Sequence, residues 1–427
     1  MALIVELGNG PAARPGAAGT VAAPWPQRGW RDRLAVMLGN PRLLRPLYRL
    51  LRRWAPVLRI GTTVVVTRHA DVVEVLDRDT EFTIAELNGP RMRRWNGDFV
   101  LGMDGGPTYE REVAALRRAA PADLAAVASF VADAAAALVD AARPAGRIDV
   151  VGGLCRVVPT RVVATFYGVP GPDEATTMRW MRALFDAVFL DDSRRARKVA
   201  QLTVAEQRPY METLIAERRS ALAAGHDVGD DMLSRLVAMG ATEAWLDDDA
   251  VRRNINGVIV GALETTAKAA ALAIDELLRR PTALATARAA ALSGDVDVVR
   301  GHVWEALRFL PHTPLLERHT ARATTVGRRH RTVPAGATVL VFTSSAMFDG
   351  AAFPEPDRFR ADRPLDRYLH FGHSLHTCFG LAVNRVQIPE LVAAVLRLPG
   401  VRRAPGGEGR LRWDGPFPDR LVVEFDR

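Results

Sequence analysis

Residues 371–380 read Phe371-Gly-His-Ser-Leu-His-Thr-Cys378-Phe-Gly380, and this is the most informative segment of the sequence. Its single cysteine lies between glycine-punctuated turns, directly before a helical pattern that runs to about Leu396 despite Pro389. Backbone N–H groups near the start of a helix stabilise a thiolate and lower its pKa. Because the thiolate is the form of cysteine that binds metals, Cys378 is predicted to be a metal ligand.

Three kinds of site remain open for Cys378. A thiolate on haem iron pushes electron density toward bound dioxygen and favours O–O cleavage, and this is the interpretation that we favour. The histidines His370, His373 and His376 leave a zinc site possible, although the Cys-x-x-Cys pairing typical of zinc is absent. A buried loop cysteine without any ligand is the third alternative.

Two further segments carry unusual polar residues. Glu305 and Arg308 lie on one face of a helix predicted over 299–309, and the apolar residues around them favour a buried structural pair over a surface ion pair. Glu264 and Thr265 fall in the middle of the longest helical pattern, Ala250–Arg280. An acid and an alcohol there could relay protons, whereas taken alone the segment favours an ordinary surface with Glu264 in solvent.

Length and composition limit the class of protein. The chain has 427 residues, 48% hydrophobic and 25% charged, which is enough apolar material for a large core. The net charge is +8, but the arginines are spread along the chain, so nucleic-acid binding is disfavoured. Cys155 and Cys378 are the only cysteines, which fits a reducing cytoplasm. No window has the roughly 18 uncharged apolar residues of a membrane span.

Secondary structure read outward from the cysteine loop is mainly helical. Strands are predicted over 57–66, 323–341 and from 401 onward, with a long irregular loop over 84–107. Helices are predicted in most of the remaining chain, at 69–77, 121–144, 172–188, 197–223, 250–280, 299–309 and 380–396. Residues 1–45 are expected to form a partly disordered arm, and residues 46–427 a single catalytic domain.

Taken together and in this order, the three segments resemble the cytochrome P450 family. The chain matches the family's haem loop, Phe-Gly-x-Gly-x-His-x-Cys-x-Gly, at Phe371, Gly372, His376, Cys378 and Gly380. It departs at Ser374, where the family prefers glycine. The resemblance implies an α-rich triangular prism with a small β-sheet region, and haem b bound through the Cys378 thiolate.

The resemblance also implies roles for residues outside the loop. Glu305, Arg308 and Arg363 would form the structural network behind the haem. Arg318 and His376 would contact the haem propionates. Tyr109 and Val113 occupy the places of the family's His-x-x-x-Arg, so Tyr109, with Arg111 or Arg117, is expected to replace those contacts. Glu264 and Thr265 resemble the oxygen-activating pair, with Ala262 where glycine is common.

The implied activity is insertion of one oxygen atom from dioxygen into an apolar small molecule, in secondary metabolism. A ferredoxin and its reductase would supply electrons to a cytoplasmic monomer. The expected pocket residues are Val258, Ile259, Ala262, Leu315, Phe185 and Phe189. A peroxide-using or hydroperoxide-rearranging enzyme and a non-catalytic haem protein are the alternatives, because a fold alone does not fix a function.

Overall fold

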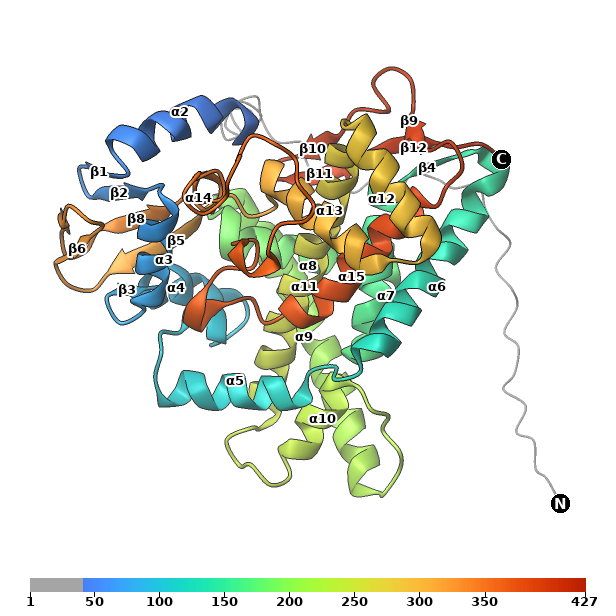
Figure 1. Cartoon of the computed structure of the whole chain (residues 1–427). Coiled ribbons are helices and arrows are strands. Elements are labelled where there is room, and N and C mark those ends of the chain that lie inside the picture. The colour runs from blue at the N-terminus through green and yellow to red at the C-terminus, as the bar shows by residue number, and fades with distance from the viewer. Residues whose placement is uncertain (1–40) are drawn as a thin grey trace.

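About 58% of the chain is helical in this computed structural model, which describes residues 41–427. The body is broad at the level of α2 and α6 and narrows toward α10 (Figure 1). The helices are α2 Pro41–Trp54, α3 His69–Asp77, α4 Ala85–Trp95, α5 Pro107–Ala119, α6 Leu124–Ala142, α7 Val157–Phe166, α8 Glu174–Phe185, α9 Arg194–Ala223, α10 Met232–Met239, α11 Asp248–Leu277, α12 Pro281–Ser293, α13 Val296–Phe309, α14 Thr343–Ala346 and α15 Leu381–Leu396.

The strands form small sheets beside this helical body. They are β1 Val57–Ile60, β2 Thr63–Val66, β3 Phe82–Thr83, β4 Arg147–Asp149, β5 Leu316–Thr320, β6 Thr324–Val326, β7 Arg331–Val333, β8 Thr338–Val341, β9 Arg402–Arg403, β10 Arg412–Asp414, β11 Phe417–Arg420 and β12 Val422–Glu424. The main sheet has the order β1-β2-β8-β5-β3, and β6–β7 and β10–β11 are hairpins. The expectation of an α-rich fold with a small β region is confirmed.

Helix α11 is the centre of the core. The Asp247 side chain caps its start by accepting a hydrogen bond from the Ala250 N–H at 2.8 Å. It packs against α7, α8, α13 and α15, and its apolar residues are buried on almost every side. By length and composition α6 and α11 could each span a membrane, which is weak support for a span because core helices such as α11 pass the same test.

The prediction of a long irregular loop over 84–107 was wrong. The structure forms α4 over Ala85–Trp95 despite Pro90 inside it. The Asp104 carboxylate accepts hydrogen bonds from the backbone N–H groups of Ile84 and Ala85, at 2.7 and 3.1 Å. These donors lie at the start of the helix, so the cap comes from a residue about 20 positions later and no local pattern reveals it.

Most other element boundaries agree closely with the sequence. The predicted helix 250–280 is Asp248–Leu277, and the predicted helix 380–396 is Leu381–Leu396. Helices α5, α7, α10 and α12 were not predicted. The expected arm over residues 1–45 lies outside the described residues except for its last five, which begin α2.

Candidate active site around Cys378

The loop before α15 is folded tightly around its cysteine. The Cys378 N–H donates to the Phe371 carbonyl at 2.7 Å, and the Thr377 N–H donates to the Ser374 carbonyl at 3.0 Å. Two residues of the loop have left-handed backbone conformations, Gly372 at φ 75° and Ser374 at φ 58°. Ser374 therefore adopts, at an energetic cost, a conformation that glycine adopts freely.

The Cys378 side chain is exposed by surface area, although protein surrounds it closely enough that burial raises its thiol pKa. The Gly380 backbone N–H acts in the opposite direction and lowers that pKa. These two observations agree if the sulfur faces an open space inside the protein. A Cβ on Gly380 would lie 3.8 Å from the sulfur and 3.2 Å from the Asn384 amide nitrogen, so the next turn of helix lies close to the sulfur.

One face of α11 is incompletely covered by protein. Between residues 254 and 277, only Gly261, Ala262, Thr265 and Lys268 are incompletely buried. Their spacing places all four on one side of the helix, and a Cβ on Gly261 would meet no atom within 4 Å. On an adjacent side, the Thr266 hydroxyl donates to the Asn384 side-chain oxygen at 2.9 Å.

Asn384 thus joins the middle of α11 to the helix that begins at the cysteine loop. The same Asn384 side chain would lie 3.2 Å from a Cβ on Gly380, so it lies beside the turn that carries Cys378. Asn384 therefore lies between the turn of Cys378 and the segment of α11 that contains Glu264 and Thr265.

Three polar residues from separate elements gather on one side of the cysteine loop. The Tyr109 hydroxyl donates to the Leu375 carbonyl at 2.7 Å, and its ring lies edge-on to His376 with centroids 5.4 Å apart. Arg318, on β5, is close enough that its charge lowers the His376 pKa, after the larger effect of burial, to about 4.

These residues fit the carboxylates of a haem. Arg318 is 5% exposed, yet it forms no ion pair with any residue in 41–427, and burial lowers its pKa to about 10. The His376 Nδ1 is buried without a hydrogen-bond partner among the same residues. A buried guanidinium without a carboxylate is costly, and a propionate would supply the missing anion.

Arg111 and Arg117, the two other candidate propionate contacts on α5, have different surroundings. The Arg111 guanidinium lies over the Trp245 ring, 4.5 Å from its centroid, so the structure gives it a contact unrelated to the cysteine loop. Arg117 is close enough to Tyr109 that its charge lowers the hydroxyl pKa, although burial raises that pKa overall. Arg117 therefore lies nearer the candidate propionate contacts than Arg111 does.

The network behind the loop is completely buried. The Arg308 guanidinium donates to both Glu305 carboxylate oxygens, at 2.7 and 2.8 Å, and both side chains are 0% exposed. Arg363 lies 3.4 Å from the same carboxylate. Tyr368, which the sequence analysis did not identify, donates its hydroxyl to Glu305 at 2.8 Å.

The suggestion that Glu264 lies in solvent was wrong. Its side chain is 2% exposed and forms ion pairs with Arg156 at 2.9 Å and Arg182 at 3.2 Å. Burial alone would raise the Glu264 pKa, but the two arginines lower it overall. Arg182 also reaches Asp414 at 3.2 Å. The neighbouring Thr265 hydroxyl donates to the Gly261 carbonyl at 2.5 Å.

The aromatic candidates for the pocket lie beside this acid. Phe185 packs against Phe189 and Phe417, with centroids 4.9 and 5.8 Å apart, and the Arg182 guanidinium lies over Phe417. Among the other candidates, Ala262 and Leu315 are partly exposed, whereas Val258 and Ile259 are buried. Ile259, at 0% exposure, belongs to the core.

A zinc site receives no support. No group of three or more His, Cys, Asp or Glu side chains that could hold a metal ion occurs in residues 41–427. His370 is engaged elsewhere, because its Nε2 lies 2.8 Å from the Trp304 carbonyl. His373 pairs with Asp77 on α3 at 3.2 Å.

Comparison with known proteins agrees with this arrangement. The sequence model of the family described as "Cytochrome P450" matches residues 58–398. The chain is 33% identical to "Cytochrome P450 monooxygenase PikC" of Streptomyces venezuelae, over 67% of this chain and 64% of that protein. It is 29% identical to "Mycinamicin IV hydroxylase/epoxidase" of Micromonospora griseorubida, over 62% of this chain and 63% of that protein. Both matches span less than two thirds of the relative's own length.

Solved structures show the same fold. The structure of CalO2 superposes with a TM-score of 0.79 at 24% identity, over 90% of this chain and 96% of that one. At this level of identity the likeness concerns the fold alone.

Proposed function

We propose, because this chain belongs to the cytochrome P450 family, that it is a haem-dependent monooxygenase that inserts one oxygen atom of dioxygen into an apolar small molecule. The observation that supports the proposal is the position of Asn384, which accepts a hydrogen bond from Thr266 of α11 and lies next to the turn of Cys378, with Glu264 and Thr265 just before Thr266 on that helix. Haem held by a cysteine thiolate supplies the chemistry of dioxygen activation.

The side chains of this protein would hold the cofactor and its charges. Cys378 would bind the haem iron through its thiolate. Arg318, His376 and Tyr109 lie together and would bind the propionates, supported by the Arg318 charge that lacks an ion pair and by the unpartnered His376 nitrogen. Arg111 is not needed for this role, because it contacts Trp245 instead.

Glu264 and Thr265 would deliver protons. The Thr265 hydroxyl is partly exposed on the open face of α11, where it can hold or pass on a proton. Glu264 is charged and fixed by two arginines, so a proton reaches it only when an arginine changes partner. Arg182 has such a partner in Asp414, whose side chain is 26% exposed and connects the acid to solvent.

The substrate is proposed to be apolar and to belong to secondary metabolism. Phe185, Phe189 and Phe417 form an aromatic wall beside the Glu264 network. The names of the relatives, which include a hydroxylase/epoxidase of mycinamicin IV, support a secondary metabolite. A ferredoxin and its reductase are proposed as the electron donors in the cytoplasm.

The proposal is tested on the purified haem protein. We expect the reduced, carbon-monoxide-bound protein to show the strongly red-shifted Soret band of thiolate ligation, and Cys378→Ser to lose it. An unshifted band in the unaltered protein would overturn the assignment of the ligand. Oxidation of a substrate with reduced ferredoxin and dioxygen supports a monooxygenase, whereas turnover with peroxide alone supports a peroxide-using enzyme.

The role of Thr265 has its own test in the same assay. Thr265→Ala should consume oxygen without forming product, and Thr265→Ser should keep the two coupled, because it retains the hydroxyl. If oxygen consumption stayed fully coupled to product formation in the alanine variant, Thr265 would not deliver protons.

A further inference from the structure

Helix α2 turns an apolar stripe toward solvent. Leu43, Leu47, Leu50 and Trp54 are 61, 48, 56 and 66% exposed, and their spacing of four, three and four residues places them on one face. Ile60, at the tip of β1, is 64% exposed as well. Of the large hydrophobic side chains that are exposed within residues 41–427, half lie in this one short segment. A contiguous stripe of this kind marks a binding surface rather than scattered surface residues.

The orientation of α2 is the reverse of that expected for a helix covering a core. Two of its arginines face the protein: Arg45 donates to the Phe309 carbonyl at 2.6 Å, and Arg52 donates to the Ser345 carbonyl at 2.9 Å. Tyr48 is buried between them and packs against Phe342. Arg49 and Arg53 are exposed. Because the polar side of the helix anchors it, the apolar stripe is left outward. This costs free energy unless an apolar medium covers it.

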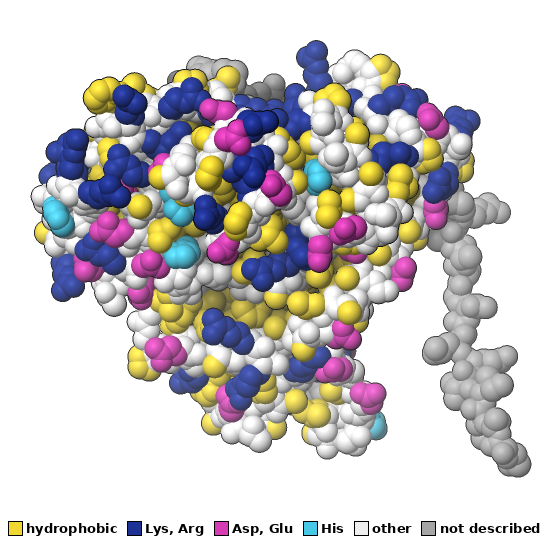
Figure 2. Space-filling model, viewed as in Figure 1, with side chains coloured by type: hydrophobic (Ala, Val, Ile, Leu, Met, Phe, Trp, Pro, Cys, Tyr) yellow, Lys and Arg dark blue, Asp and Glu magenta, His cyan; other side chains and the backbone are white. Residues whose placement is uncertain are grey.

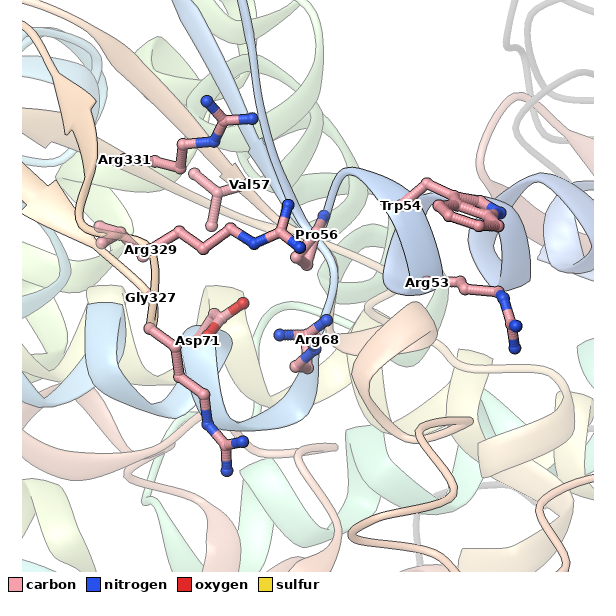
Figure 3. Close-up of a pocket in the computed structure, with 11 residues that line it drawn as sticks. Arg53, Trp54, Pro56, Val57, Arg68, Asp71, Gly327, Arg329 and Arg331 are labelled. Atoms are coloured by element: carbon pink, nitrogen blue, oxygen red, sulfur yellow. The ribbon is translucent and has the colours of Figure 1, made fainter.

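An arginine-rich cleft continues from the end of this stripe. Trp54 and Arg53 of α2 line it together with residues of β1, α3 and the β6–β7 hairpin (Figure 3). The arginines of the lining are Arg53, Arg68, Arg328, Arg329 and Arg331. The hairpin arginines form no ion pair with any residue that the structure describes.

The cleft carries a large excess of positive charge. Asp71 is its single carboxylate, against five arginines. Figure 3 shows Arg68, Arg329 and Asp71 reaching toward the middle, while Arg53 and Arg331 point outward at the rim. In the space-filling view, the upper left of the molecule carries both apolar and basic side chains, with a few acidic ones among them (Figure 2). Such a cleft favours phosphate groups, which guanidinium groups bind in pairs of hydrogen bonds.

We propose that this face, α2 with the adjoining arginine cleft, docks the protein on the surface of an anionic phospholipid bilayer. The stripe would enter the boundary between headgroups and acyl chains, with Trp54 at the interface, and the cleft would bind lipid phosphates. Charge complementarity selects this occupant. A second copy of the chain would bring five arginines against five arginines in a two-fold contact, and soluble phosphate would leave the stripe uncovered.

The test is sedimentation of the holoprotein with vesicles, scored as the fraction bound. Vesicles of equal parts phosphatidylglycerol and phosphatidylcholine should bind the protein, and added salt should weaken binding. Leu50→Glu should lower the partition coefficient at least about tenfold, and Arg329→Gln about fivefold. Leu202→Glu is the matched control, because Leu202 on α9 is 58% exposed but lies outside the stripe, and it should bind as the unaltered protein does.

Several outcomes would overturn this proposal. Equal binding by Leu50→Glu and the control would show that the stripe does not contribute to membrane binding. Salt-insensitive binding to pure phosphatidylcholine would show that the arginine cleft does not contribute. Thermal stabilisation by glycerol phosphate without vesicle binding would make the cleft a site for free phosphate. Self-association that Leu50→Glu abolishes, again without vesicle binding, would make the stripe a dimer contact. The carbon-monoxide spectrum of each variant reports folding and haem binding independently, so failure here leaves the proposed oxidation chemistry untouched.

Discussion

Two buried glutamates, each held by arginines, lie in different kinds of network. Glu305 accepts two hydrogen bonds from Arg308, one from Tyr368 and one from the Arg360 backbone N–H. Arg308 in turn donates to three backbone carbonyls. Both Glu305 and Arg308 are thus bonded to the main chain as well as to each other, so neither can move without breaking several hydrogen bonds.

Glu264 is held only by side chains. Arg156 and Arg182 each leave a buried Nε without a partner in the described structure, and Arg182 divides its hydrogen bonds between Glu264 and Asp414. An acid held only by side chains can exchange partners at a modest cost in free energy. Glu305 and Glu264 are both buried, so the completeness of their hydrogen bonds, rather than burial, separates a structural acid from one that can transfer protons.

The largest effect is expected from breaking the complete network. Glu305→Gln should lower the free energy of unfolding by about 3–5 kcal/mol, because it leaves the Arg308 charge buried without its carboxylate. Chemical denaturation of the holoprotein measures this loss. The control is Glu174→Gln, which removes a surface pair with Arg161 and should cost less than about 1 kcal/mol. Equal losses in the two variants would contradict the comparison.

The same network predicts sensitivity to acid. Burial alone would raise the Glu305 pKa, but Arg308 and the other donors hold it below its ordinary value of 4.5. Its stabilising contribution is therefore present above pH 4.5 and is lost as the pH falls through the lowered pKa. Glu305→Gln should show a smaller acid-induced loss of stability than the unaltered protein.

A substitution at Glu264 is expected to cost less stability and more function than one at Glu305. Glu264→Gln should reduce product formed per oxygen consumed by about 100-fold, because an amide cannot carry the proton. Stability should fall by only about 1–2 kcal/mol, since Arg182 keeps Asp414 as a partner. Glu206→Gln, at the surface, is the control. Unchanged coupling would show that Glu264, like Glu305, is structural.

The charge of Lys268 on α11 differs from those of Glu305 and Glu264, because no carboxylate of the described residues pairs with it. Burial lowers the Lys268 pKa from 10.5 to about 8, and the described residues offer it no ion pair. Lys268→Met should therefore stabilise the protein at pH 7 by about 1–2 kcal/mol. The unfolded chain binds more protons between pH 8 and 10.5, so the unaltered protein should gain stability across that range and the variant should not. Identical thermal unfolding curves over this range would contradict the prediction.

The smallest effect is expected in the cysteine loop. Ser374→Gly removes the strain of a left-handed serine, φ 58°, and should stabilise the holoprotein by about 0.5–1 kcal/mol. The rise in thermal midpoint and a slower loss of haem measure this effect. Ser374→Ala keeps the Cβ atom and should give no gain, and a gain of equal size in that variant would rule out backbone strain as the cause.

Local signals predicted much of the fold. The helices predicted over 380–396 and 250–280 were found at Leu381–Leu396 and Asp248–Leu277, because their periodicity involves residues that lie close together in sequence. Helix α4 did not follow, because its N–H groups are capped by Asp104 from beyond its other end. Local propensity does not reveal a cap supplied by a residue so far away.

Three features follow from local sequence: Cys378 stands before a helix, Glu305 and Arg308 share a face, and an acid and an alcohol lie in the middle of the central helix. The partners of these groups follow from the tertiary structure. Arg156 and Arg182 reach Glu264 from positions about 110 and 80 residues earlier in the chain, and the outward turn of the α2 stripe depends on where its arginines find carbonyls. Local periodicity fixes which residues share a face, whereas packing between distant segments fixes what that face meets.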